Sequence, residues 1–309
     1  MDILRTPDEQ FDDLPGYDFT PRYVEVPVDA DGEGFDPGAT LRVHYLDEGP
    51  ADGPVVLLLH GEPTWSYLYR HMIPVLTGAG LRCIVPDLVG FGRSDKPAAQ
   101  ADHTYARQVA WMRAALFDVL DLADITFFGQ DWGSLVGLRL VAEHPDRFTR
   151  VAIGNGGLPT GDGRMSKAFM DWQNFASTTE HFPVGAIING GSTSDLDEAI
   201  VAAYNAPFPD DSYKAAARVY PSLVPVAEDN PAVPANRAAW AALGEFTKPF
   251  LTAFSDEDPI TKGGFRILQS HIPGAQNQPH VTIEGGGHFL QEDRGPELAQ
   301  VIIDFAAAS

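Results

Sequence analysis

The chain has 309 residues, of which 44% are hydrophobic and 21% are charged, a balance typical of a folded globular protein and not of a disordered one. This length suits one α/β domain that carries an inserted segment. The formal net charge of -22 disfavours partners with phosphate backbones or anionic lipid surfaces, so neither nucleic-acid binding nor membrane binding is expected, whereas neutral small molecules remain possible.

The N-terminal segment Met1–Leu14 is acidic and polar, without the basic and apolar regions of a signal peptide. No apolar stretch reaches the roughly 18 residues that a membrane-spanning helix needs. We therefore expect a cytoplasmic protein. The single cysteine, Cys83, has no partner for an intrachain disulfide and lies in an apolar run, which indicates a buried structural thiol.

Short β-rich runs alternate with helical patterns over most of the chain. The first two runs, Val24–Val26 and Leu41–Leu46, are typical of antiparallel strands at a sheet edge. The alternation after them predicts a doubly wound α/β domain, in which a mostly parallel eight-stranded sheet is flanked by helices on both faces. The further predicted strands are Val55–His60, Arg82–Val85, Ile125–Gly129, Val151–Gly154, Phe250–Phe254 and Val281–Ile283. The predicted helices of this domain are Tyr105–Leu120, Ser134–Glu143 and Pro296–Ala306.

The alternation stops between Leu158 and Phe246, where helical segments broken by Pro and Gly take over. These segments include Met165–Ala176 and Asn236–Gly244. We interpret residues 158–246 as a helical cap inserted into a core that consists of residues 1–157 and 247–309. Because no long linker or low-complexity tract joins the two, the cap is expected to pack on the sheet domain.

The pentapeptide Gly129–Gly133 follows a predicted strand and precedes a predicted helix. Its form, Gly-x-nucleophile-x-Gly, is that of a nucleophile elbow, a sharp turn that pushes one side chain out above the sheet. Here that side chain is Asp131. An Asp that merely caps a helix fits the pentapeptide alone equally well, but the preceding strand favours a nucleophile.

The sequence His60-Gly61-Glu62-Pro63 directly follows Val55–Leu59, the apolar part of the predicted strand. The chain must turn there over the carboxyl ends of the strands, where ligands bind in such folds. In hydrolases with an elbow, a backbone N–H from this loop and the one after the nucleophile converge on the developing oxyanion. The candidate donors are therefore the N–H groups of Glu62 and Trp132, and His60 is interpreted as a structural brace of the loop.

Two later residues complete a catalytic set in the chain order nucleophile, acid, base. His288 lies in a glycine-rich turn after a predicted strand and is the candidate general base. Asp258 lies just past the strand Phe250–Phe254 and is the candidate acid that orients His288, with Asp256 as the rival.

A carboxylate nucleophile points to one kind of reaction. Asp is ionised at neutral pH and can attack without a base, provided that the substrate offers an electrophilic sp3 carbon. The attack would form an ester on Asp131, and a water activated by His288 would hydrolyse that ester at its carbonyl carbon. An ordinary serine esterase is therefore disfavoured.

These motifs resemble those of the haloalkane dehalogenases, and the likeness covers nearly the whole chain. In the predicted core it runs through His60–Arg70 (HGEPTWSYLYR), Pro86–Pro97 (PDLVGFGRSDKP), Gln130–Gly133 and Gly287–Asp293 (GHFLQED). In the predicted cap, the segments similar to the first subfamily are Ala206–Tyr213 (APFPDDSY) and Phe169–Phe175 (FMDWQNF). The resemblance implies an α/β-hydrolase fold and the hydrolytic removal of halide from haloalkanes.

The resemblance also implies a halide site made by two side-chain N–H donors. One donor would be the indole of Trp132, which can only donate. Another dehalogenase subfamily has an Asn directly after the His-Gly pair, where this chain has Glu62, so the second donor is expected to be Trp172 in the cap. Candidates for an apolar pocket lining, each of which would also suit plain core packing, are Phe169, Phe208 and Phe289.

Two other functions remain open. An epoxide hydrolase would use the same nucleophile, base and acid and would need cap tyrosines, for which the candidates are Tyr204, Tyr213 and Tyr220. Against it, Glu62 and Trp172 favour a halide site. A catalytically silent ligand-binding protein is the alternative of another class, and the presence of all three catalytic candidates disfavours it.

The expected reaction takes a small apolar halogenated substrate and water and releases alcohol, halide and a proton. No metal or organic cofactor is expected. The loop Pro86–Pro97, with its turn glycines, is interpreted as structural. The sequence predicts no particular oligomeric state.

Overall fold

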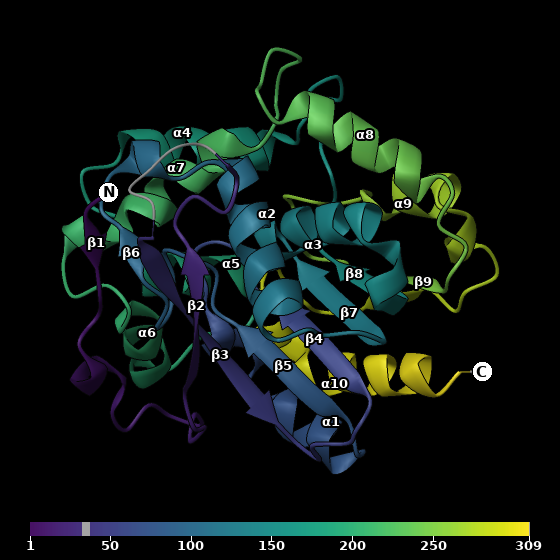
Figure 1. The fold of residues 1–309 in the computed structure, drawn as a ribbon, viewed down its shortest axis with the longest axis horizontal. Coiled ribbons are helices and arrows are strands. Elements are labelled where there is room, and N and C mark those ends of the chain that lie inside the picture. The colour runs from purple at the N-terminus through teal and green to yellow at the C-terminus, as the bar shows by residue number, and fades with distance from the viewer. Residues whose placement is uncertain (33–37, 309) are drawn as a thin grey trace.

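Figure 1 shows the computed structural model of the chain, which describes residues 1–32 and 38–308. Among these residues, eight strands form one sheet in the order β10-β9-β8-β7-β4-β5-β3-β2. Neighbouring strands from β10 to β5 are parallel, whereas β3 is antiparallel to both β5 and β2. The prediction of a mostly parallel sheet with an antiparallel pair at one edge is confirmed.

The strands lie close to their predicted positions. The central strands β7 and β9 are buried along their whole length, which explains why they read as continuous apolar runs. A short antiparallel pair, β1 (Ile3–Leu4) and β6 (Lys96–Pro97), is additional. The main sheet consists of β2 (Arg22–Pro27), β3 (Thr40–Glu48), β4 (Val55–Leu59), β5 (Arg82–Pro86), β7 (Ile125–Gln130), β8 (Phe148–Gly154), β9 (Phe250–Ser255) and β10 (Val281–Ile283).

Helices cover both faces of the sheet (Figure 1). α1 (Ile73–Gly78) and α10 (Leu290–Ala307) pack together on one face. α2 (Tyr105–Arg113) and α3 (Trp132–Glu143) pack together on the other, and α9 (Phe265–His271) contacts β9. The sheet thus has one layer of helices on each face, as the alternation of strands and helices predicts.

Two predicted helices differ in detail from the observed ones. The helix expected at Tyr105–Leu120 is α2 followed by a wider π-helical turn at Ala114–Val119. α10 begins at Leu290, well before the predicted start at Pro296, because its first turns precede a kink at Arg294. The sequence pattern predicts a helix start at Pro296 because proline is favoured in a first helical turn. In the structure Pro296 follows the kink and lies inside a longer helix.

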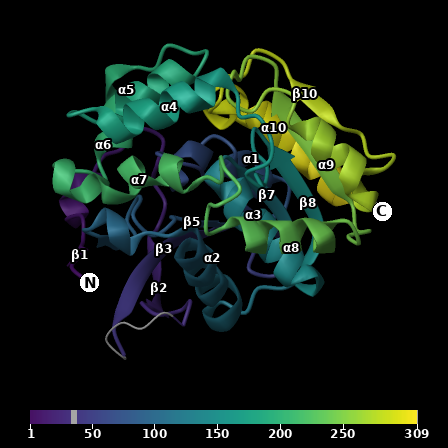
Figure 2. The same cartoon turned by 90° about the horizontal axis from the view of Figure 1, so that it is seen from above.

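Between β8 and β9 the described chain contains helices and no strand of the main sheet. They are α4 (Lys167–Thr178), α5 (Val184–Gly191), α6 (Glu198–Asn205), α7 (Ala215–Leu223) and α8 (Val233–Leu243). α4 packs with α7 and α5 packs with α6, whereas α8 packs on α3 (Figure 2). No helix in residues 1–32 and 38–308 is long and apolar enough to cross a membrane.

Candidate active site

Asp131 lies in the sharp turn between the end of β7 and the start of α3. Its backbone angles, φ 50° and ψ -125°, fall in a region that residues other than glycine rarely adopt. Its N–H donates to the backbone oxygen of Asn155, at the end of β8, over 3.0 Å. The turn therefore has the geometry of a nucleophile elbow, at the edge of the sheet where ligands bind in open α/β folds.

Two glycines let the backbone close around this turn. A Cβ atom on Gly133, in the first turn of α3, would collide with the backbone oxygen of Leu59 at the end of β4. A Cβ atom on Gly61 would collide with the side chain of Asp131 itself. Glycine at these two positions is what allows α3 and the loop after β4 to approach so closely.

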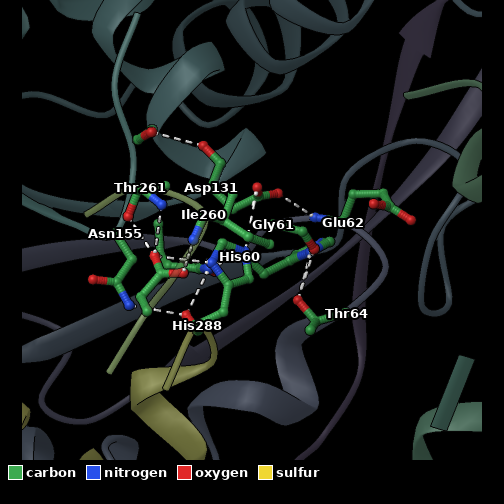
Figure 3. Close-up of polar contacts among 12 residues, drawn as sticks. His60, Gly61, Glu62, Thr64, Asp131, Asn155, Ile260, Thr261 and His288 are labelled. Carbon is green, nitrogen blue, oxygen red and sulfur yellow. Dashed lines mark hydrogen bonds and ion pairs between the residues drawn. The ribbon is translucent and has the colours of Figure 1, made fainter. Parts of the chain in front are cut away.

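Figure 3 shows the polar contacts of the Asp131 carboxyl group. The backbone N–H of Glu62 donates to Asp131 Oδ1 over 2.8 Å. Trp132, the other predicted donor, is the first residue of α3, where N–H groups have no acceptor within the helix. One predicted oxyanion donor thus already contacts the carboxyl group, and the other lies next to it in the chain.

His288 is buried on the loop between β10 and α10. Its Nε2 lies 3.5 Å from Asp131 Oδ2, and its Nδ1 lies 3.2 Å from Asp258 Oδ2. Burial lowers the pKa of His288, but the charges and hydrogen bonds of Asp258 and Asp131 outweigh burial and raise the pKa to about 10. The three predicted catalytic side chains therefore form one continuous line of contacts.

Asp258 is fully buried after β9. It accepts hydrogen bonds from the N–H of Ile260 over 2.8 Å and of Thr261 over 3.2 Å, and also from the Thr261 hydroxyl. Burial raises the pKa of Asp258, but His288 and these donors outweigh burial and lower the pKa to about 2. The rival Asp256 is exposed and accepts instead from the N–H of Gly285 over 2.7 Å.

Two buried amide side chains beside His288 belong to no predicted site. Asn155 donates to the backbone oxygen of His288 over 3.1 Å and accepts from the N–H of Ser255 over 2.9 Å. Gln130, which precedes the nucleophile, donates to the same oxygen of His288 over 3.1 Å. The two amides hold the loop that carries His288. Their positions at the carboxyl ends of β8 and β7 are the one sequence signal that could have found them.

The side chain of Glu62 is buried next to Asp131. Burial and the charge of Asp131 raise the pKa of Glu62 well above its ordinary value, against smaller opposing effects of the His288 charge and the Trp172 side chain. Burial and the neighbouring carboxylate thus both favour the neutral, protonated form of this carboxyl group. His60 is also buried, and its Nε2 accepts from the N–H of Leu88 over 2.9 Å, which is the bracing contact expected of it.

Two cavities meet at the Asp131 carboxyl group. The first cavity, of about 550 Å³, lies between α4, α5 and the loop that carries His288. The second cavity, of about 460 Å³, lies between α3, residues 156–166 and the segment after β9. The residues that line both cavities are Glu62, Asp131, Phe169, Trp172 and Ile260.

Both predicted halide donors face this space. Trp132 is buried, lines the second cavity and has its ring centroid 4.5 Å from that of Tyr220. Trp172 lies half-buried on α4, lines both cavities and has its ring centroid 5.7 Å from that of Phe182. The two indoles thus come from the sheet domain and from the inserted helices, and both line the second cavity together with Asp131.

The aromatic residues considered for the pocket divide into two groups. Phe169 and Phe289 line the first cavity. Phe208 lines neither cavity, and its buried ring has its centroid 6.5 Å from that of Phe91, so of the two alternatives left open for Phe208 the structure supports core packing. Aromatic character alone does not separate the two groups, because both kinds of residue are buried.

Comparisons with known proteins agree with this geometry. The family model described as alpha/beta hydrolase fold matches residues 54–295. A haloalkane dehalogenase from Psychrobacter cryohalolentis is 57% identical over 99% of this chain and 98% of its own length. The chain belongs to the haloalkane dehalogenase family. A second family member, from Mycobacterium marinum, is 52% identical over 99% of this chain and 100% of its own length.

The fold agrees with that of a solved family member. The haloalkane dehalogenase DpaA from Paraglaciecola agarilytica NO2, described as tetrameric, superposes with a TM-score of 0.88 at 34% identity. The match covers 100% of this chain and 99% of the other. The expected α/β-hydrolase fold is therefore confirmed over the full length.

The cap tyrosines that an epoxide hydrolase would need lie away from both cavities, which agrees with membership of the haloalkane dehalogenases. The Tyr204 hydroxyl donates to Glu292 over 2.5 Å, and the Tyr220 hydroxyl donates to Gln108. Neither these two nor Tyr213 lines the first or the second cavity. In the described part of the chain, no tyrosine hydroxyl faces the Asp131 carboxyl group from these cavities.

Proposed function

We propose that Asp131 is the nucleophile with which this chain hydrolyses the carbon–halogen bond of haloalkanes. The chain is a hydrolase acting on carbon–halide bonds, as its full-length relatives indicate. The proposal for Asp131 rests on one observation: Oδ1 accepts the Glu62 N–H over 2.8 Å, while Oδ2 faces His288 Nε2 at 3.5 Å. A carboxylate held in this way can attack an sp3 carbon without help from a base.

In the first step, Asp131 Oδ2 attacks the carbon that bears the halogen. A carbon–oxygen bond forms, the carbon–halogen bond breaks, and the halide leaves with the bonding electron pair. Oδ1 stays on the Glu62 N–H and becomes the carbonyl oxygen of the new ester. The product of this step is an alkyl ester of Asp131 and a halide ion.

In the second step, His288 takes a proton from a water that attacks the ester carbon of Asp131. Esterification removes the negative charge of Asp131, and with it one of the causes that raise the pKa of His288 to about 10. The lower pKa of the His288 imidazole then lets it accept a proton from the water that attacks the ester. The N–H groups of Glu62 and Trp132 hold the oxyanion, and collapse releases the alcohol and a proton and restores the carboxylate.

The halide is proposed to lie between the indole N–H groups of Trp132 and Trp172. An indole N–H can only donate, which suits an anion in a largely apolar cavity. The raised pKa of Glu62 supports this assignment, because a neutral carboxyl group does not repel a halide. Such a pair of tryptophans would place this chain with the first subfamily of its family.

The division into a core, residues 1–157 and 247–309, and a cap, residues 158–246, is part of this proposal. Within the cap, α4 and α5 wall the first cavity, whereas α8 packs on α3 of the core. The helices α4 to α7 are thus the part of the cap proposed to close the site. A cytoplasmic location and the lack of a metal or organic cofactor stay predictions.

The proposed function is tested with bromoalkanes of several chain lengths and, separately, an epoxide. Bromide and the matching alcohol should appear in equal amounts, and no diol should form from the epoxide. Asp131→Asn, which keeps the shape of the side chain, should release no bromide above background. If the unmodified chain releases no bromide from any bromoalkane, or hydrolyses only the epoxide, the proposal is wrong.

A further inference from the structure

The two cavities differ in which reacting groups they touch at their inner ends. His288 lines the first cavity and not the second. Trp132 lines the second cavity and not the first, and Trp172 lines both. A halide held by the two indoles therefore lies at the inner end of the second cavity, whereas the water that His288 would activate lies at the inner end of the first.

The outer ends of the cavities differ in charge. The first cavity has two exposed lining carboxylates, Asp171 and Glu257. Lys167 lies 2.5 Å from Asp171 and compensates its charge, but no cation of the described part of the chain lies at ion-pair distance from Glu257. The first cavity therefore opens beside a net negative charge.

The second cavity has two exposed lining cations, Arg164 and Lys262. Within residues 1–32 and 38–308, neither cation has a carboxylate at ion-pair distance. Asp162 also lines this cavity and lies 3.5 Å from Arg237, which in turn lies 3.6 Å from Glu228. These three side chains together carry one negative charge, which is less than the two positive charges of Arg164 and Lys262. The second cavity therefore opens beside a net positive charge.

The difference in charge between the two openings affects only one of the molecules that enter or leave the site. Haloalkane, water and alcohol are neutral, so charges at a cavity opening leave their movement almost unchanged. The halide is an anion that leaves a chain with a formal net charge of -22. At physiological salt, screening limits charge effects to about 8 Å, so the nearest rim residues decide which opening attracts the halide.

We propose that the halide product leaves through the second cavity, past Arg164 and Lys262, while neutral substrate, water and alcohol use the first. The proposal rests on the proposed function, which supplies the halide and its position between the two indoles. It assigns to Arg164 and Lys262 a role in product release, and no role in the chemical steps.

Bromide binding measures this route without turnover, because release and binding follow the same path in opposite directions. Trp132 and Trp172 line the cavities, so bromide should quench tryptophan fluorescence, and stopped-flow mixing gives the association and dissociation rates. The double variant Arg164→Gln/Lys262→Gln should slow bromide association about three- to tenfold at low salt, and high salt should remove the difference. The matched variant Glu257→Gln, at the first cavity, should leave the association rate within about twofold.

A second pair of variants tests the route by size instead of charge. Gly163 lines the second cavity and Gly190 the first, and an added Cβ atom at either position would meet no atom within 4 Å. Gly163→Phe should slow both binding and release of bromide several-fold. Gly190→Phe should lower kcat/KM for a bromoalkane and leave the bromide rates unchanged.

The outcomes separate this inference from the proposed function. If Glu257→Gln or Gly190→Phe changes the bromide rates while the second-cavity variants do not, the halide uses the first cavity and the inference is wrong. Unchanged bromide rates in all the variants also overturn it. In either case, bromide release from a bromoalkane by the unmodified chain would leave the proposed function intact.

Discussion

At Asp131, the chemistry depends on the residue itself, whereas the position of its side chain depends on neighbouring residues. The residue type sets the proposed reaction, because a carboxylate can attack an sp3 carbon and form an ester. Among the neighbours, Gly133 and Gly61 lack the Cβ atoms that would collide with the surrounding chain, and the Glu62 N–H donates to one carboxylate oxygen. Each contribution can be changed separately by a single substitution.

His288→Phe should stop the second step and not the first. Without a base the ester on Asp131 cannot be hydrolysed quickly, so a bromoalkane should release one bromide per chain and then stop. Mass spectrometry of the Asp131 peptide should show the added alkyl group. The double variant His288→Phe/Asp131→Asn is the control and should show no added mass. An unmodified Asp131 peptide in the single variant would contradict the covalent route.

Glu62→Gln should remove the titratable charge of Glu62 while it keeps the shape of the side chain. The pKa of Glu62 is raised by burial and by the charge of Asp131, which favours the neutral form, and the group gains a negative charge as pH rises through that raised pKa. Bromide affinity of the unmodified chain should therefore fall at alkaline pH, and that of Glu62→Gln should fall less. Titration of tryptophan fluorescence with bromide between pH 7 and pH 10 measures both, with about a tenfold difference expected for one pKa unit of interaction. Parallel pH profiles would mean that Glu62 does not titrate in this range.

At the scale of elements, the site lies where strands that are neighbours in space end together. β4, β7, β8 and β9 are adjacent in the sheet. The loops after them carry Glu62, Asp131, Asn155 and Asp258. Because the strands are parallel, four segments far apart in sequence deliver their side chains to one edge. The position of α3 against β4 is the packing contact on which the elbow depends.

Gly133→Ala should destabilise the fold and displace the nucleophile together. The added Cβ atom would collide with the backbone at Leu59, which cannot move without shifting β4. We expect the free energy of unfolding to fall by about 2 kcal/mol or more, as in overpacked cores, with a matching loss of activity. Gly78→Ala is the control: this helical glycine is exposed and has no atom within 4 Å of an added Cβ, so urea unfolding should show no loss. Equal stability of the two variants would show that α3 can move away from β4.

At the scale of the whole molecule, two buried groups couple stability to pH. The pKa of Asp258 is lowered from 3.8 to about 2, so its contribution is present above about pH 4 and is lost as pH falls through 2. The pKa of His288 is raised from 6.5 to about 10, so its contribution is complete below about pH 6.5 and is lost as pH rises through 10. Both contributions are complete only between about pH 4 and pH 6.5.

Asp258→Asn should therefore lower the Tm most between about pH 4 and pH 6.5, and the difference from the unmodified chain should shrink towards pH 10. Thermal unfolding followed by circular dichroism across this range measures the effect. Asp256→Asn, on the same loop but exposed, is the control and should show no such pH profile. A Tm difference that is constant with pH would mean that Asp258 stabilises the fold without an ionised His288.

Features that depend on neighbouring residues in the chain could be predicted from the amino-acid sequence. The apolar runs gave the strands of the main sheet, the turn glycines gave the elbow at Asp131, and the order of motifs gave His288. These features follow from strand periodicity, backbone sterics and side-chain chemistry, all of which act over a few residues. A local signal with two meanings did not decide between them: Pro296 lies inside α10 and not at its predicted start, and Phe208, which suited a pocket or the core, packs in the core.

Features that depend on contacts between distant segments became clear from the folded chain alone. It separated Asp258 from Asp256, brought Asn155 against the His288 loop, and buried Glu62 so that its pKa is raised. It also formed two cavities with different charges at their openings. The physical reason is that burial, electrostatic coupling and cavity shape depend on which strand ends and inserted helices are neighbours, and parallel strands make neighbours of residues more than a hundred positions apart.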